Sequence, residues 1–153
     1  MLNEHVPSAD GLMLKGSHGI RHHQEVPSVS TYIEIRLAAR LSRKPEQAVT
    51  IGLKNDLFSV VAYSGSVPVG IGRVIGDGGC FFEVVDIAVL PAHQKKGVGD
   101  LIMQALMGYI HENAPPTKYV SLMADHGTPI FYERYDFQPS VLPEKAGMFL
   151  HIK

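Results

Sequence analysis

A short stretch rich in glycine and lysine has the composition of an anion-binding turn. Gly97 and Gly99 lack side chains that would keep a bulky anion away from the backbone, and Lys95 and Lys96 add positive charge. If a helix begins here, its first N–H groups have no acceptor within the helix, and its dipole favours negative charge. Residues 93–99 therefore predict a site for a diphosphate, and an ordinary solvent-exposed turn is the alternative.

Two carboxylates, Glu83 and Asp86, interrupt the otherwise apolar segment 81–90. A carboxylate buried without a partner has a raised pKa, which suits a general base near neutral pH. Each is therefore a candidate base, unless an arginine such as Arg73 pairs with it or it faces solvent at a strand end. Because the two are three residues apart, a regular strand places them on opposite faces unless a bulge intervenes.

A buried strand and an amphipathic helix must position these groups. The nearly continuous apolar run 81–90 predicts a strand buried on both faces. The helix is predicted over 97–113 and ends before Pro115 and Pro116. Its apolar residues recur with helical spacing at Val98, Leu101, Ile102, Ala105, Leu106, Tyr109 and Ile110.

The rest of the chain predicts a mixed sheet with helices packed on it. Strands are expected at 57–63 and 67–75, separated by a Ser-Gly-Ser turn. A helix at 31–43, capped by Ser30 or Thr31, has an apolar side formed by Ile33, Leu37 and Leu41. The other expected elements are a short strand at 12–15 or 20–25, a helix at 45–53, a strand at 119–124, a helix at 129–135 and a closing strand at 147–152. The predicted class is α/β (α+β), one domain over 1–153 with a mixed central sheet of six to seven strands and about four helices.

The glycine turn matches neither the nucleoside triphosphate loop nor the Rossmann glycine motif. Gln94, Gly97 and Gly99 instead match the Gln/Arg-x-x-Gly-x-Gly/Ala loop of the GCN5-related N-acetyltransferases, the GNAT superfamily, which the chain resembles. Residues 86–89 are similar to the family's Asp-Leu-Ala-Val strand, and residues 131–137 look like its Phe/Leu-Tyr-x-x-x-Gly-Phe motif. The three motifs follow one another in the family's order.

The resemblance implies acetyl-CoA, or a related acyl-CoA, as the acyl donor. Its pyrophosphate is then held by backbone amides of Gln94, Lys95, Lys96, Gly97, Val98 and Gly99. The pantetheine arm runs beside Ile87, Ala88 and Val89 like an added strand, so main-chain hydrogen bonds supply affinity.

Acyl transfer to an amine needs a neutral nitrogen, whereas a free alkylamine with a pKa of about 10 is mostly protonated at neutral pH. Glu83 lies eleven positions before Gln94, the offset at which histone-type members of the family carry their base, so Glu83 ranks ahead of Asp86. Tyr132 occupies the family's tyrosine position, which implies an acid that protonates the departing thiolate. Without the motif, Tyr132 would be taken as ordinary aromatic core.

Two positions depart from the family pattern. Asp136 replaces the usual glycine, and we expect the turn to survive because aspartate tolerates the left-handed conformation. Asp125 stands where the family usually has an asparagine that contacts the cofactor, and an ionised acid cannot donate that hydrogen bond.

Composition excludes several other classes of protein. With 14 basic and 15 acidic residues the net charge is −1, so no nucleic-acid or anionic-membrane partner is expected. The single cysteine, Cys80, excludes an intramolecular disulfide, and no ligand set is completed around His18, His22 and His23, so no metal is expected. No signal peptide or apolar run of about 18 residues is present, which predicts a cytoplasmic protein.

The predicted function is an N-acetyltransferase that moves the acetyl group of acetyl-CoA to a primary amine of a small molecule, by direct attack in a ternary complex. The expected acceptors are an arylalkylamine, a polyamine or an amino sugar. One alternative is acetylation of a protein or peptide at lysine or the N-terminus. Another is a non-catalytic acyl-CoA-binding regulatory module, for which Asp125 argues. The chain is expected to be a monomer or a homodimer.

Overall fold

The computed structural model describes residues 19–116, 118–125, 127–140, 144, 146–148, 150 and 152. The chain divides into two compact units, Met1–Val120 and Ser121–Lys153. The elements in order are β1 (Ile20–Gln24), α1 (Val29–Ala38), α2 (Glu46–Leu53), β2 (Phe58–Ser64), β3 (Val67–Gly76), β4 (Phe81–Val89), the 3-10 turn η1 (Pro91–His93), α3 (Val98–Asn113), β5 (Tyr119–Ser121) and α4 (Pro129–Glu133).

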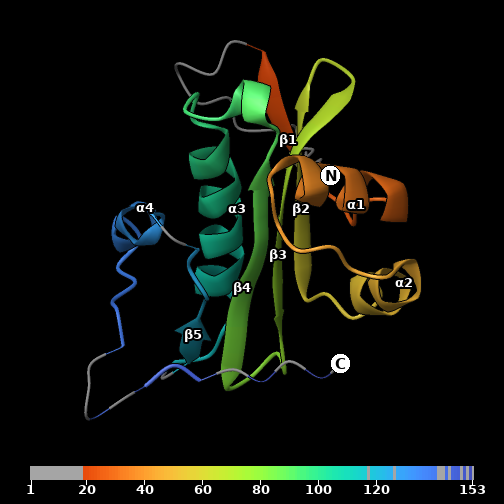
Figure 1. Ribbon diagram of the computed structural model, residues 1–153. Coiled ribbons are helices and arrows are strands. Elements are labelled where there is room, and N and C mark those ends of the chain that lie inside the picture. Colours follow the sequence, from red (N-terminus) through yellow and green to blue (C-terminus); the bar gives the residue numbers. More distant parts are fainter. Residues whose placement is uncertain are drawn as a thin grey trace, which may run out of the picture. The chain divides into compact units, whose positions relative to one another are not determined.

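The strands form one sheet in the order β1-β2-β3-β4-β5, and β1 to β4 pair antiparallel in chain order. Helices α1 and α2 cover one face of this sheet and α3 covers the other (Figure 1). The α+β class predicted from the sequence is confirmed, with five strands described where six or seven were expected. The expected strand at 12–15 lies outside the described residues, and the described residues of 147–152 are not in a strand.

The central strands follow the sequence prediction closely. β2, β3 and β4 each begin and end within about one residue of the expected bounds. The apolar run of β4 is covered on both sides of the sheet. Its most buried residues are Phe82, Val84, Ala88 and Val89, as a strand between two helical layers requires.

Helix α3 begins one residue after the predicted start. Gly97 lies at the N-cap with φ +83, a left-handed conformation that glycine adopts without a steric penalty. The apolar stripe faces the sheet as predicted. Its buried residues are Val98, Leu101, Ile102, Met103, Leu106 and Ile110.

The first helix, α1, begins and ends earlier than the predicted range 31–43. Ser28 rather than Ser30 or Thr31 caps it, since the Ser28 Oγ accepts a hydrogen bond from the Thr31 N–H at 3.1 Å. At the other end Arg40 takes the left-handed conformation, with φ +63, and ends the helix without a glycine. A stop of this kind carries no glycine signal that a sequence could reveal.

The buried side of α1 was also predicted wrongly. The expected apolar side was Ile33, Leu37 and Leu41, yet Leu37 is 44% exposed. The buried residues are Tyr32, Ile35 and Arg36. An arginine on the buried side breaks the periodicity on which the prediction relied, and it is tolerated because its charge is paired, as described below.

Gly72 of β3 allows α3 to approach the sheet closely. An added Cβ there would lie 2.4 Å from Ile102 Cγ2 and 3.1 Å from both Ile87 Cδ1 and Leu106 Cδ1. Three tightly packed side chains would have to move to accommodate it. The absence of a side chain at Gly72 is therefore a packing requirement.

Replacing Gly72 by alanine is expected to lower the free energy of unfolding by about 1–3 kcal/mol through overpacking. Urea denaturation measures this loss. The matched control is Gly108→Ala in α3, where an added Cβ meets nothing within 4 Å and helix propensity predicts a gain of up to about 1 kcal/mol. Equal stability of Gly72→Ala and the wild-type protein would contradict the packing argument.

Among the described residues no helix is both long enough and apolar enough to cross a membrane.

Candidate functional site

The glycine-rich turn lies between the end of β4 and the start of α3. It is exposed from Gln94 to Gly97 and becomes buried at Val98. Lys95 and Gly97 both have left-handed backbones, with φ of +59 and +83. Such residues bend the chain so that successive N–H groups line a concave turn, a geometry that suits an anion.

Two side-chain hydrogen bonds hold this turn in place. The Gln94 Nε2 donates to the Val89 carbonyl at 3.0 Å, which ties the turn to the last residue of β4. The Lys96 Nζ donates to the Ala92 carbonyl at 2.7 Å, which keeps its positive charge beside the turn. The turn is therefore fixed to β4 and carries a cation close to its backbone.

The turn leads into a helix of 16 residues, whose dipole adds positive potential at its start. Within α3 the first carbonyl bond is made by the Gly97 oxygen, which accepts from the Leu101 N–H at 3.0 Å. The N–H groups of Val98 and Gly99 lie in the first turn of α3, where no earlier carbonyl of the helix can accept a hydrogen bond from them. The turn at 94–99 thus combines backbone N–H groups without intrahelical acceptors with positive charge, an arrangement that can accept an anion.

The end of β4 offers backbone groups on the side away from β3. The Leu90 N–H donates to the Val69 carbonyl at 2.8 Å and so points toward β3. Successive residues in an antiparallel pair alternate in direction, so the N–H of Val89 points to the opposite side. The Val89 carbonyl agrees with this direction, because it accepts its hydrogen bond from Gln94.

β5 does not reach this end of β4. The Tyr119 N–H donates to the Cys80 carbonyl at 2.9 Å, so β5 begins beside the start of β4. Its three residues span about 10 Å, whereas the nine residues of β4 span about 30 Å. The edge beyond, which includes Ile87, Ala88 and Val89, is therefore not paired with β5, as an added strand-like ligand requires.

A bulge interrupts β4 at Asp86. Arg73 pairs with Val85 and Ile71 pairs with Ala88, so Asp86 and Ile87 both lie opposite the single residue Gly72. Asp86 has φ +58, a left-handed backbone. The strand therefore contains one extra residue between its start and the edge described above.

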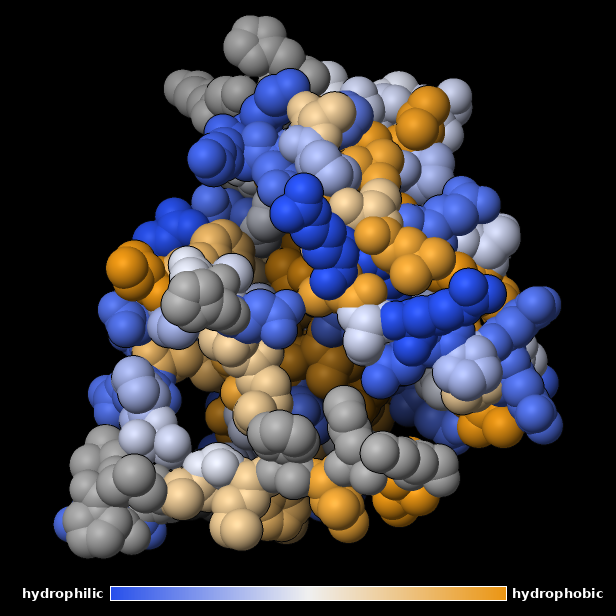
Figure 2. All heavy atoms as spheres, viewed as in Figure 1, coloured by the Kyte–Doolittle hydropathy of each residue, from blue (hydrophilic) through white to orange (hydrophobic). Residues whose placement is uncertain are grey.

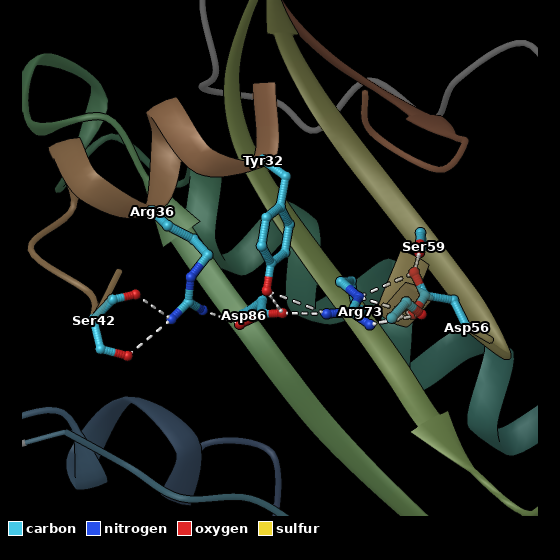
Figure 3. A network of polar contacts seen from close by, with 8 residues as sticks. Tyr32, Arg36, Ser42, Asp56, Ser59, Arg73 and Asp86 are labelled. Atoms are coloured by element: carbon cyan, nitrogen blue, oxygen red, sulfur yellow. Dashed lines mark hydrogen bonds and ion pairs between the residues drawn. The ribbon is translucent and has the colours of Figure 1, made fainter. Parts of the chain in front are cut away.

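The Asp86 carboxylate is held by three side chains from two other elements (Figure 3). The Tyr32 hydroxyl donates to Oδ2 at 2.7 Å, Arg73 Nη1 donates to Oδ2 at 2.5 Å, and Arg36 Nη1 donates to Oδ1. The alternative raised from the sequence, that an arginine such as Arg73 pairs with Asp86, is confirmed. Its carboxylate is occupied by these partners.

The network extends beyond Asp86 to the connections around α1 and α2. Arg36 Nη2 donates to the Ser42 carbonyl at 2.9 Å. Arg73 Nη2 donates to Asp56 Oδ1 at 2.5 Å, and the Asp56 side chain is only 2% exposed. Two arginines and two aspartates thus balance in charge within a buried region, which is the condition under which buried ions are tolerated.

The titration behaviour of the network reflects this arrangement. Burial, with the hydrogen bond to Asp86, raises the pKa of Tyr32 to about 12. Burial alone would lower the pKa of Arg73, but hydrogen bonds and charge from Asp56 and Asp86 raise it overall. Tyr32 therefore keeps its proton and Arg73 its charge throughout the neutral range.

Glu83 lies on the same face of the sheet as this network. Arg73 points toward α2, because its Nη2 approaches the Gly52 carbonyl at 3.4 Å. Residues directly opposite one another share a face, and Glu83 lies opposite Ile75, two residues after Arg73. The bulge is thus the reason why Glu83 and Asp86 occupy one face despite their odd spacing.

Glu83, like Asp86, is partly exposed. The difference lies in the contacts of the Glu83 carboxylate. Within the described part of the chain its side chain has no hydrogen bond or ion pair. A partly buried carboxylate without a partner can accept a proton from a bound group. The two candidate bases are therefore distinguished by their partners.

Sequence reasoning missed most of the network. Tyr32, Arg36 and Asp56 were not singled out as site residues. Each contacts residues more than ten positions away in sequence, so no local pattern reveals them. Buried arginine is rare without a partner. The burial of Arg36 could not be foreseen, because the wrong side of α1 was expected to face the sheet.

The second unit contains the remaining predicted residues. Tyr132 lies in α4, partly buried, with ring contacts to Phe131 and Phe137 at 5.0 Å and 6.4 Å between centroids. Burial, together with the negative charge of Asp125, raises the pKa of Tyr132. Asp136 has φ +65, so the expected left-handed turn at the family's glycine position is confirmed.

Figure 2 shows hydrophobic side chains exposed among hydrophilic ones at the surface. On α1 and α2, Leu37 and Ile51 are 44% and 58% exposed. No group of histidine, cysteine, aspartate or glutamate able to hold a metal ion occurs within the described ranges. The chemistry of the region is therefore that of carboxylates, backbone amides and apolar surface.

Comparisons with known proteins agree with these features. The family profile of an acetyltransferase (GNAT) domain matches residues 55–139. A probable acetyltransferase of unknown function from meticillin-resistant Staphylococcus aureus is 38% identical, with a TM-score of 0.81 over 87% of this chain and 99% of that one. A comparison with curated protein sequences gave no match.

Two further solved structures share the fold. A GNAT-family acetyltransferase from Streptococcus pneumoniae is 22% identical, with a TM-score of 0.72 over 88% of this chain and 98% of that one. One from Brucella melitensis, solved in complex with acetyl-CoA, is 18% identical, with a TM-score of 0.61 over 80% of this chain and 84% of that one.

Proposed function

Because the chain belongs to the GNAT family of acetyltransferases, we propose that it moves the acetyl group of acetyl-CoA to the primary amine of a small molecule. The observation that carries the proposal is the exposed turn at 94–97, fixed to the end of β4 by the bond from Gln94 to Val89. In the proposal, the amides of this turn bind the anion beside the backbone groups of β4 that are not paired with β5. A diphosphate followed by an amide-containing arm has the same sequence of groups.

In the proposed reaction Glu83 accepts a proton from the acceptor amine, directly or through a water molecule. The neutral amine nitrogen then forms a bond to the acetyl carbon as the carbon–sulfur bond breaks, and it releases its second proton to solvent. The Tyr132 hydroxyl supplies a proton to the departing thiolate. The Tyr132 hydroxyl carries the proton that this step requires at neutral pH, since its pKa lies above the ordinary value of 10.0.

A small acceptor is favoured over a lysine-rich protein segment by the charges on α1, α2 and their connection. Arg40, Arg43 and Lys44 are exposed there, against the two exposed acids Glu34 and Glu46. Among the described residues of this region there is thus no acidic excess that would attract a lysine-rich peptide. The exposed apolar residues of the same helices suit an amine that carries a hydrophobic group, such as an arylalkylamine.

Binding of acetyl-CoA is expected to stabilise the protein by about 2.7 kcal/mol at a ligand concentration 100 times Kd. Thermal unfolding with and without acetyl-CoA measures this gain. The control is S-acetyl-pantetheine, which lacks the nucleotide and its diphosphate and is expected to bind far more weakly. No stabilisation at millimolar acetyl-CoA would remove the basis of the proposal.

The acceptor is then sought with a panel of arylalkylamines, polyamines, amino sugars and lysine peptides, by measuring the CoA released. Turnover with a small amine supports the proposal, and turnover only with peptides transfers it to a protein acetyltransferase. Binding without any turnover favours the regulatory module suggested by Asp125, which cannot donate the hydrogen bond that the family's asparagine supplies.

A further inference from the structure

The bulge in β4 determines which backbone groups the end of the strand presents. Without the extra residue at Asp86, every later residue of β4 would shift by one position relative to β3. A shift of one exchanges the two faces of a strand and reverses the direction of its N–H groups. Val89 would then direct its N–H toward β3 instead of toward the free edge.

The bulge is held from the face covered by α1 and α2. Asp86 is in a left-handed conformation that few residues adopt readily. Its carboxylate binds Tyr32, Arg36 and Arg73, and the side chains of this ion-pair cluster are at most 10% exposed. These charge-assisted bonds are among the stronger hydrogen bonds in proteins and fix the position of the bulged residue.

The bulge is also held from the face covered by α3. Opposite it, Gly72 leaves room for Ile87, Ile102 and Leu106, whose methyl groups lie within 3.1 Å of where a Cβ would be. Ile87, the second residue of the bulge, is thereby packed against α3. Polar contacts on one face and packing on the other constrain the same two residues.

From this arrangement we infer that Asp86 is a positioning residue, held by Arg36, Arg73 and Tyr32, which sets the backbone edge at Ile87–Val89 for the acyl donor. Asp86 does not take the proton of the acceptor amine. Its carboxylate affects the reaction indirectly, by fixing the course of the β4 backbone. The inference rests on the proposed function, because it concerns the edge to which acetyl-CoA is proposed to bind.

The inference separates the roles of the two carboxylates of β4. Loss of a base lowers turnover and leaves donor affinity unchanged. Loss of a residue that positions the donor edge weakens donor binding as well. Glu83→Gln and Asp86→Asn are therefore expected to differ in the parameter that each changes.

The test measures the Kd of acetyl-CoA by calorimetry for Asp86→Asn, at a temperature where circular dichroism shows the protein folded. Asparagine keeps the tolerance for the left-handed conformation and removes the charge. We expect acetyl-CoA to bind about tenfold or more weakly, because small displacements of binding groups have large effects. Arg36→Lys is the second variant, which keeps the positive charge but loses the planar, bidentate guanidinium. If Asp86→Asn does not fold, the Kd of acetyl-CoA for Arg36→Lys tests the inference.

A destabilised control separates this effect from a general loss of stability. Ile110→Ala removes a fully buried side chain near the C-terminal end of α3, and it is expected to bind acetyl-CoA as the wild-type protein does. Unchanged affinity in the folded Asp86→Asn or Arg36→Lys protein would overturn the inference. Failure of the wild-type protein to bind acetyl-CoA would instead overturn the proposed function.

Discussion

Replacing Glu83 by glutamine is expected to lower kcat by about 10²- to 10⁴-fold, the usual contribution of a positioned general base. Glutamine keeps the size of the side chain and removes its ability to take a proton. The fold is expected to be retained, because the Glu83 side chain has no hydrogen bond or ion pair within the described residues. Steady-state rates with the amine identified in the panel measure the loss, and calorimetry is expected to give an unchanged Kd for acetyl-CoA.

The pH dependence of the variant provides a second measurement. Without a base, turnover depends on the small fraction of amine that is already neutral. For an amine with a pKa of about 10 that fraction rises about tenfold for each unit between pH 7 and 9. Glu83→Gln is therefore expected to regain activity steeply in this range, whereas the wild-type rate levels off earlier.

A matched control is Glu112→Gln, the same change at an exposed residue near the end of α3, which is expected to have wild-type activity. If CoA release is followed with a thiol reagent, the exposed Cys80 also reacts, so one equivalent must be subtracted. Full activity of Glu83→Gln at neutral pH would exclude Glu83 as the base.

Replacing Tyr132 by phenylalanine is expected to lower kcat by about 100-fold, because the departing thiolate then lacks its proton donor. The ring and its contacts with Phe131 and Phe137 are preserved. The Kd of acetyl-CoA is expected to stay within about twofold of the wild-type value, as for any group that acts mainly in the transition state. Tyr135→Phe, a hydroxyl removed three residues further on, is the control and is expected to remain active.

The pKa of Tyr132 predicts how kcat depends on pH. Burial, with the charge of Asp125, raises it above the ordinary value of 10.0. The acid form is needed, so the loss of activity caused by Tyr132 ionisation begins only above that pH. Asp125→Asn removes the charge that raises the pKa, and the alkaline limb of the kcat profile is expected to move to lower pH. An alkaline limb unchanged in both Asp125→Asn and Tyr132→Phe would show that another group donates the proton.

Most of the central fold could be predicted from local patterns. The strands β2 to β4 are separated by glycine-containing turns, and α3 has an uninterrupted apolar stripe, so their bounds agree closely with the structure. Helix α1 was predicted less well because Arg36 occupies its buried side. Periodicity assumes that buried positions are apolar, and here the charge of a distant strand makes an arginine acceptable.

The predicted site residues differ in how local their signals are. Gln94 and Gly97 could be identified because anion binding by a turn depends on adjacent residues and backbone conformation. Asp86 required knowledge of its partners, two of which lie on α1 some fifty positions away. The bulge that it occupies depends on the register between β3 and β4, for which a single strand sequence contains no direct signal.

The free edge at the end of β4 bears on how readily this protein could escape an inhibitor. A compound that binds the backbone of Ile87 to Val89 contacts atoms that every amino acid except proline supplies. Single substitutions there change the packing beneath the edge but leave its hydrogen-bonding groups in place. A resistance mutation would have to change the course of the β4 backbone, which would also weaken binding of the natural acyl donor. For the same reason, related sequences can diverge widely along this strand without losing the contact.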